Sequence, residues 1–323
     1  MADNYRTAAS NFPAGFNNVT VRGVPITQSH PGQVFWVSNA TTVLPGQIGG
    51  SDGNAGSFNA PFSTLDYAIG ACTANRGDII FIKPGHAETI STATAVALDV
   101  AGVAIVGLGT GTKRPTFTLD TANTATLGVS AANISVQNCL FVANFLTIAS
   151  CFTLSTAANF TLQGCEFRDT SAALNFANVV KSTGAANTVD GLYVADNFYQ
   201  SIGTTFNTLV LTANDINALQ IHSNFIATIS TGDIATLCVV SAGVLTGGFI
   251  TRNNTKRKNT TTTNAMVNVG GTTSSVILRD NFASCLDGTN NINWVVTTGL
   301  VGQGNTYSGA IAGQGFTIPA LDS

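Results

Sequence analysis

Charged residues are scarce in this sequence. Only 9% of its 323 residues are Asp, Glu, Lys or Arg, and the formal net charge is −3, whereas an average globular protein is about 25% charged. A disordered chain would also be poor in aliphatic and aromatic residues, but this one is 44% hydrophobic and contains 19 Phe. The composition therefore favours a folded core under a weakly charged surface. The small net charge gives no electrostatic reason to expect a nucleic-acid partner.

Other signals are missing as well. No stretch reaches the roughly 18 apolar residues of a membrane span, so we expect no membrane partner. The first residues, MADNYRTAAS, do not resemble a secretion signal. The six cysteines form no CxxC pair and the three histidines are scattered, so we expect no disulfide framework, no metal and no other cofactor.

What the chain does contain is a repeat of about 28 residues, starting near residue 126. An alternating apolar segment recurs, and a second alternating segment lies between its copies. Alternation with a period of two is typical of strands, and no helical pattern of crossover length intervenes. The repeat therefore predicts a parallel β-solenoid. The recurring segments ISVQNC, FTLQGC, LYVADN, LQIHSN, FITRNN, VILRDN and LVGQGN end at Cys139, Cys165, Asn197, Asn224, Asn254, Asn281 and Asn305.

Equivalent positions of neighbouring coils in a solenoid lie about 4.8 Å apart. The residues that end the repeats should therefore form a structural ladder along one corner, where Asn tolerates a left-handed turn. The aromatic residues that follow should stack inside as a second ladder: Phe141, Phe167, Phe198, Phe225, Phe282 and Tyr307. With the strand-like segments 78–90 and 102–111, we expect about nine coils between residues 78 and 318.

The glycine-rich stretch 49–60 raises the question of a nucleotide-binding loop. Its glycines are spaced GxxGxxG and no Lys follows as in a P-loop, which argues against that function. A cation site using Asp52 and Asn54 stays open, although further acidic ligands are missing from the loop. Pro61 and the apolar residues that follow predict a short amphipathic helix, which would cover the end of the solenoid.

Residues 50–90 carry a family resemblance. A Gly- and Asp-rich turn, a proline-led helix and the strand DIIFIKPGHAET follow in that order. This run resembles the first segment of pectate-lyase-like right-handed β-helix proteins, and most of all those of tailed bacteriophage particles. The resemblance implies an all-β, right-handed parallel β-helix and a homotrimer. The expected boundaries are an N-terminal arm with lead-in strands at 1–48, a turn and capping helix at 49–77, and the β-helix at 78–323.

Enzymatic function would need paired acids. Glycoside hydrolysis uses two carboxylates about 5–9.5 Å apart, whereas Asp196 and Asp280 share a register but lie three coils, roughly 14 Å, apart. Glu166 and Asp196 are on neighbouring coils at different registers. We therefore expect no catalytic residues and no enzyme. The alternative is a polysaccharide depolymerase in which Glu166 and Asp196 are the best candidates.

One surface feature is basic. His222, Arg252 and Arg279 each stand two places before the end of a repeat and should form an outward stripe, and the segment 252–264 places Lys256, Arg257 and Lys258 beside it. Such a patch could bind an acidic protein surface, an anion or a glycan. The alternative is a solvated insertion without a ligand.

Together with the resemblance, these patterns predict a structural virion protein of a tailed bacteriophage, made in the host cytoplasm without a signal peptide. A trimeric capsid decoration (cement) protein bound to the major capsid protein, or to another virion protein, is the favoured form. The alternative is a tail fibre or spike that binds or depolymerises a host surface polysaccharide. A passive glycan-binding adhesin is a third interpretation.

Overall fold

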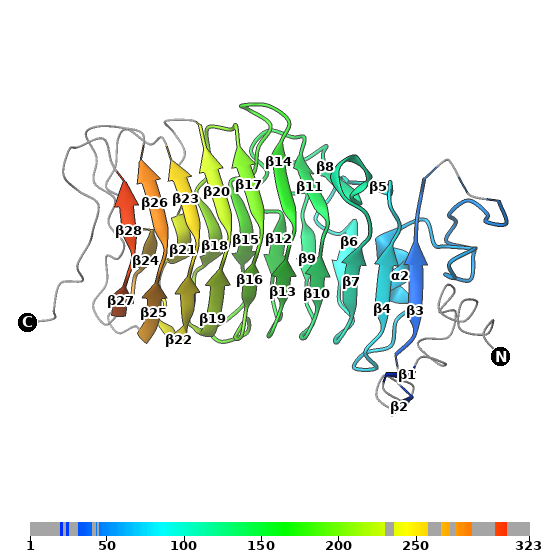
Figure 1. The fold of residues 1–323 in the computed structure, drawn as a ribbon, viewed down its shortest axis with the longest axis horizontal. Coiled ribbons are helices and arrows are strands. Elements are labelled where there is room, and N and C mark those ends of the chain that lie inside the picture. The colour runs from blue at the N-terminus through cyan, green and yellow to red at the C-terminus, as the bar shows by residue number, and fades with distance from the viewer. Residues whose placement is uncertain are drawn as a thin grey trace, which may run out of the picture.

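The computed structural model describes residues 20–21, 24–25, 32–40, 43, 45–229, 236–257, 266–271, 275–285 and 301–308. Its strands stack into a parallel β-solenoid of the right-handed type, with almost no helix. Figure 1 shows this stack from the side, with strand β3 near one end and strand β28 at the other. The expectation of an all-β parallel solenoid is confirmed.

Each complete turn contributes one strand to each of three parallel sheets. The first sheet contains β3 (Val34–Val37), β4 (Ile79–Ile82), β7 (Ala104–Gly107), β10 (Ser135–Gln137), β13 (Thr161–Gln163), β16 (Tyr193–Ala195), β19 (Ile216–His222), β22 (Leu245–Thr251), β25 (Ser275–Arg279) and β27 (Val301–Gln303). The second contains β5 (Ala87–Ile90), β8 (Thr116–Leu119), β11 (Leu140–Ala143), β14 (Glu166–Asp169), β17 (Phe198–Ser201), β20 (Phe225–Thr228), β23 (Asn254–Arg257), β26 (Phe282–Cys285) and β28 (Thr306–Ser308). The third contains β6 (Val96–Leu98), β9 (Leu127–Val129), β12 (Phe152–Leu154), β15 (Asn178–Ser182), β18 (Thr208–Thr212), β21 (Thr236–Val240) and β24 (Val267–Val269).

Seven turns have a strand in all three sheets. Two further turns have described strands in the first and second sheets, and residues 286–300 and 309–323 lie outside the described residues. The estimate of about nine coils therefore stays a prediction.

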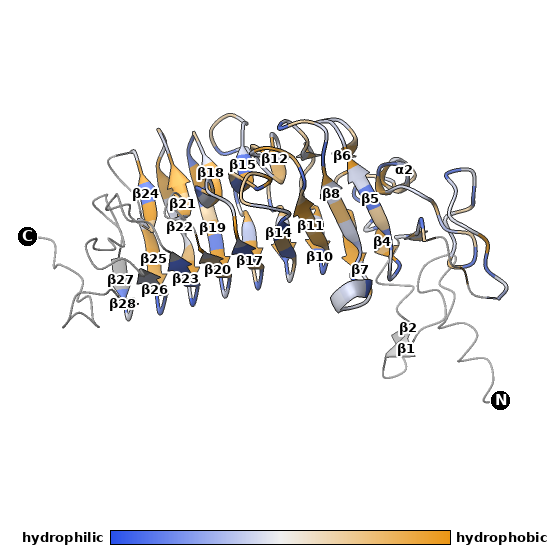
Figure 2. Ribbon diagram, turned by 90° about the horizontal axis from the view of Figure 1, so that it is seen from above, coloured by the Kyte–Doolittle hydropathy of each residue, from blue (hydrophilic) through white to orange (hydrophobic). Residues whose placement is uncertain are grey.

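The core follows from strand alternation. Inward residues such as Val136, Leu162 and Val194 occupy one register position on successive strands of the first sheet, and all three are buried. Stacking such positions on every turn produces one continuous apolar cluster, from Val37 to Ala283. Figure 2 shows the strands as largely hydrophobic and the turns along one edge of the stack as hydrophilic.

The first sheet begins earlier in the sequence than expected. Strand β3 pairs in parallel with β4, so that Val34 lies opposite Ile79. Residues 49–77 therefore form an excursion between the first two strands of this sheet. The region expected as an arm lies mostly outside the described residues; within it, β1 (Thr20–Val21) and β2 (Val24–Pro25) form a short antiparallel pair.

Helix α2 (Leu65–Gly70) lies at the N-terminal end of the stack. It contacts β3 and β6, which are the first strands of their sheets, and Leu65 is buried in the common core. The Asp66 carboxylate accepts a hydrogen bond from the backbone N–H of Ala97 in β6 at 2.9 Å. Glu88 in β5, the first strand of the second sheet, accepts from the backbone N–H of Leu65 at 3.0 Å. The helix thus engages the terminal strands of all three sheets, which protects exposed strand edges.

Within the described residues, the other helical element is a short 3₁₀ helix, η2 (Gly111–Lys113). Among the described residues, no helix is long and apolar enough to cross a membrane.

Candidate functional site

A buried row of asparagine side chains follows the corner between the first and second sheets. Each amide after the first accepts hydrogen bonds from the backbone N–H and side-chain Nδ2 of the preceding asparagine, at 2.8–3.1 Å. Each Nδ2 also donates to a backbone carbonyl of the first sheet. This asparagine ladder consists of Asn197, Asn224, Asn253, Asn281 and Asn305.

Asn254 does not belong to the ladder, contrary to the sequence prediction. Asn253 accepts from Asn224, whereas Asn254 begins strand β23 opposite Phe225 and Phe282 and is exposed. The doubled asparagine in FITRNN shifted the predicted register by one residue, and a shift of one reverses the direction of every side chain.

The left-handed turn residue also differs from the expectation. The ladder asparagine follows the turn residue, which has positive φ: Asp196, Ser223, Arg252, Asp280 and Gly304 have φ between 54° and 65°. Asn138 and Gly164 fill the same role immediately before Cys139 and Cys165.

Cys139 and Cys165 occupy the ladder position in two earlier turns. Both are free and buried, and burial raises the pKa of the Cys165 thiol to about 12. The backbone N–H of Cys165 donates to Asn197 Oδ1 at 2.9 Å, so the asparagine ladder begins directly beside the cysteine pair. Raised pKa values and burial make these thiols poor nucleophiles.

The predicted inner aromatic ladder is only partly correct. Phe141 and Phe167 lie inside, with ring centroids 5.4 Å apart, and the stack extends to Phe117. Phe198 and Phe225 lie outside, with centroids 5.2 Å apart and rings within 5° of parallel. The reason is alternation: the inner rings stand two residues after the ladder position, and the outer rings stand one residue after it.

Phe282 shares the outward register of Phe198 and Phe225, with Asn254 between, and it is 39% exposed. The side chain of Tyr307 lies outside the described residues.

The predicted basic stripe is not continuous. In the outward row of the first sheet, Thr251 stands between His222 and Arg279. Arg252 lies instead at the corner, in the left-handed turn conformation. His222 Nε2 is 2.6 Å from the Tyr193 hydroxyl, and Arg279 Nε is 3.1 Å from a carboxylate oxygen of Asp280.

The rest of the patch is placed only incompletely. Lys256 is exposed on β23, the side chain of Arg257 lies outside the described region of the chain, and so does the whole of Lys258. A shallow depression of about 370 Å³ lies over β22 and β25, lined by Arg252, Arg279, Asp280 and neighbouring apolar residues. The structure therefore brings Arg252 and Arg279 to one depression, but it separates His222 from them.

The acids proposed for catalysis are engaged elsewhere. Glu166 pairs with Arg114 at 3.0 Å and with Arg168 at 2.5 Å. Asp196 accepts from the side-chain amide of Gln163 at 3.0 Å. Each carboxylate therefore has a neighbour that stabilises its charge.

Asp169 is a partly buried carboxylate that links two turns. It accepts hydrogen bonds from the Tyr199 hydroxyl at 2.8 Å, the Ser201 hydroxyl at 2.9 Å, and the backbone N–H groups of Ile202 and Gly203 at 3.0 Å. Burial raises the pKa of Asp169, and the hydrogen bonds oppose that rise only incompletely. The sequence offered no signal for this role beyond an acid at the end of a strand.

Asp52 and Asn54 organise the loop before α2. Asp52 accepts from the backbone N–H groups of Ser63 and Thr64 and from the Thr64 hydroxyl, at 2.9–3.1 Å. Asn54 donates to the backbone carbonyls of Gly49 and Pro61. Burial tends to raise the pKa of Asp52, but these donors outweigh it and lower the pKa. Within the described residues, no three His, Cys, Asp or Glu side chains are grouped so as to hold a metal.

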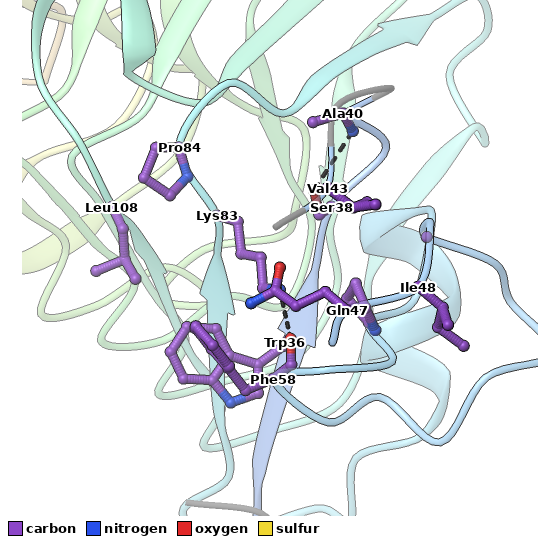
Figure 3. Close-up of a pocket in the computed structure, with 12 residues that line it drawn as sticks. Trp36, Ser38, Ala40, Val43, Gln47, Ile48, Phe58, Lys83, Pro84 and Leu108 are labelled. Carbon is purple, nitrogen blue, oxygen red and sulfur yellow. Dashed lines mark hydrogen bonds between the residues drawn. The ribbon is translucent and has the colours of Figure 1, made fainter. Parts of the chain in front are cut away.

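An apolar pocket of about 400 Å³ opens beside β3 and the end of β4 (Figure 3). Trp36 and Phe58 form one wall, with ring centroids 4.8 Å apart in an edge-to-face contact. The Lys83 side chain reaches in between Gln47 and this aromatic pair, and its Nζ lies 4.3 Å from the centroid of the Phe58 ring. We call this cavity the N-terminal pocket. Sequence reasoning missed it because its walls come from segments far apart in the chain, from Trp36 to Leu108; a lysine directly after the buried strand IIFI was the only signal.

Comparison with known proteins adds no family: no family model matches the chain, and neither a curated protein nor a solved structure matches it significantly.

Proposed function

We propose that this protein is a structural component of a tailed-bacteriophage virion, in the form of a trimeric capsid decoration protein that stabilises the shell. The observation that carries the proposal is the unbroken buried core, which extends from β3 through β26 in one rod. Because each turn is bonded to the next by backbone ladders and by stacked side chains, such a rod resists bending. Rigidity of this kind suits a protein that spans or clamps other subunits.

The acidic residues support a structural function. Asp52 and Asp66 hold the capping helix, Asp169 joins two turns, and Glu166 pairs with two arginines. Carboxylates used in this way have fixed partners, whereas a hydrolase needs a pair that faces a substrate.

The outer aromatic residues support association of copies. Phe198, Phe225 and Phe282 lie on the same outward row of the second sheet, each 36–41% exposed. Large apolar side chains gathered on one exposed face are a common feature of contact surfaces. In a trimer about the long axis, the same face of each copy would contact its neighbours. The major capsid protein or another virion protein would be the further partner.

Copy number tests the proposed function. Quantitative mass spectrometry of purified particles, calibrated on the major capsid protein, should find hundreds of copies if the protein decorates the shell. A handful of copies would place it on the tail, and its absence from particles would overturn the virion proposal.

A tail fibre or spike that binds host polysaccharide is the second candidate. Phe198 and Phe225 favour it, because two partly exposed aromatic side chains on neighbouring strands offer apolar surface for contact with sugar rings. Incubation of the purified protein with host capsule separates the candidates: shortened polysaccharide indicates a depolymerase, and bound but intact polysaccharide indicates a receptor-binding protein.

A further inference from the structure

The N-terminal pocket holds a buried cation without a described counter-ion. Lys83 is only 9% exposed. Its Nζ donates to Gln47 Oε1 at 3.3 Å and to the backbone carbonyl of Phe58, both of which are neutral acceptors. Among the described residues, Lys83 forms no ion pair, and burial lowers the pKa of its ammonium group without an opposing carboxylate.

A buried charge is costly unless it is paired. Two of the three ammonium hydrogens have acceptors in the protein, which leaves one for a ligand. The Phe58 ring stabilises the cation from one side, but it does not neutralise the charge. An anion within reach of Nζ would neutralise it.

The rest of the pocket limits the kind of anion. Its other walls include Val43, Ile48, Pro84 and Leu108, which are apolar. A phosphate or sulfate would place several charged oxygens against these walls with only one ammonium group to bind them. A carboxylate carries a single charge, and an attached apolar group would fill the remaining volume. At about 400 Å³ the pocket is within the range of small-molecule sites.

We propose that the N-terminal pocket binds a small carboxylic acid with an apolar body, with its carboxylate on Lys83 Nζ and its apolar body against Trp36 and Leu108. This ligand site is independent of the proposed virion function, since it depends only on the surroundings of Lys83.

Trp36, one of the two tryptophans of the chain, lies in the pocket wall, so its fluorescence can report binding in an experiment on the full chain. Benzoate is titrated while tryptophan fluorescence is followed, and benzamide serves as the neutral ligand of the same shape. We expect benzoate to change the fluorescence saturably and to bind at least roughly tenfold more tightly than benzamide, as one charge-assisted hydrogen bond would provide. Equal affinity for the two ligands, no saturable change with benzoate, or stronger binding of inorganic phosphate would overturn the proposal.

Two variants test whether the carboxylate of benzoate binds at Lys83. Lys83→Met keeps the length of the side chain and removes its charge, so benzoate affinity should fall at least roughly tenfold while benzamide affinity is unchanged. Lys181→Met, on β15 of the third sheet, makes the same charge change far along the chain and should bind benzoate like the wild type. Unchanged benzoate binding in Lys83→Met contradicts the proposal. If circular dichroism shows that Lys83→Met is not folded, the comparison of benzoate with benzamide on the wild type tests the proposal instead.

Discussion

The solenoid packs its turns in two ways, and the change falls between β14 and β17. In the earlier turns, the large rings Phe117, Phe141 and Phe167 are stacked inside the second sheet, and cysteine occupies the corner position in two of these turns, at Cys139 and Cys165. In the later turns, the corner position is asparagine and the stacked rings, Phe198 and Phe225, are outside. Both stacks have nearly the same spacing, 5.4 and 5.2 Å.

The inward row of the second sheet changes along with the corner residue. It runs from Phe167 to Tyr199, then Ile226, Thr255 and Ala283, so the inward side chains become smaller. The earlier turns therefore rely on ring packing, and the later turns have hydrogen bonds between buried amides. The same backbone accommodates both, because only the side chains at equivalent register positions differ.

The largest expected effect is a difference in stability between variants of an inner ring and of an outer ring. Phe141→Ala should lower the free energy of unfolding by about 4 kcal/mol, because it opens a cavity in the core. Phe225→Ala should cost about 1 kcal/mol or less, since that ring is 36% exposed and loses mainly its contact with Phe198. Urea unfolding followed by circular dichroism measures both, and equal losses would contradict the division into inner and outer rings.

A smaller effect is expected where the ladder begins. Asn197→Cys gives this turn the residue found at Cys139 and Cys165, but it removes the hydrogen bonds with Leu162 O, Asn224 Oδ1 and Cys165 N. We expect a loss of about 2 kcal/mol in the same assay. Asp196→Ser, which places at the turn the residue that Ser223 already provides with φ 57°, is the control and should be near neutral. An Asn197→Cys protein as stable as the wild type would show that the two corner types are interchangeable.

The smallest effect concerns Asp169, which joins β14 to the turn of β17. Because burial raises its pKa in the folded state, its contribution to stability is present below the unfolded pKa and is lost as the pH rises through the folded pKa. The stability of the wild type relative to Asp169→Asn should therefore be greater near pH 4 than at pH 7, since the variant does not titrate there. A difference that does not change with pH between those values would show that Asp169 keeps its ordinary pKa.

Much of the architecture could be predicted from the repeat. Alternating segments at a constant spacing indicate stacked parallel strands, and the amphipathic pattern around Leu65 indicates the capping helix. However, whether an aromatic side chain points into the core or to the outside depends on a difference of one position in the sequence. Phe141 stands two positions after Cys139 and Phe198 one position after Asn197, so a list of aromatic residues near the corner could not separate them.

The candidate sites were less predictable. The basic stripe depended on the register of FITRNN, where two adjacent asparagines fit the pattern equally well. The start of the first sheet was hidden because β3 precedes β4 by more than 40 residues, with α2 between them. The N-terminal pocket depends on the same long-range pairing, which brings Trp36 to the end of β4, and no local pattern reports it.

The two adjacent asparagines allow the most direct test of this account. Asn253→Ala removes four buried hydrogen bonds, to Asn224 N, Asn224 Nδ2, Ile221 O and Asn281 Oδ1. Asn254→Ala, one residue later, changes an exposed side chain. In parallel urea titrations we expect Asn253→Ala to lose about 3 kcal/mol and Asn254→Ala to stay within about 0.5 kcal/mol of the wild type. The reverse order, or equal losses, would contradict the ladder and the register on which the placement of the outer aromatic and basic residues depends.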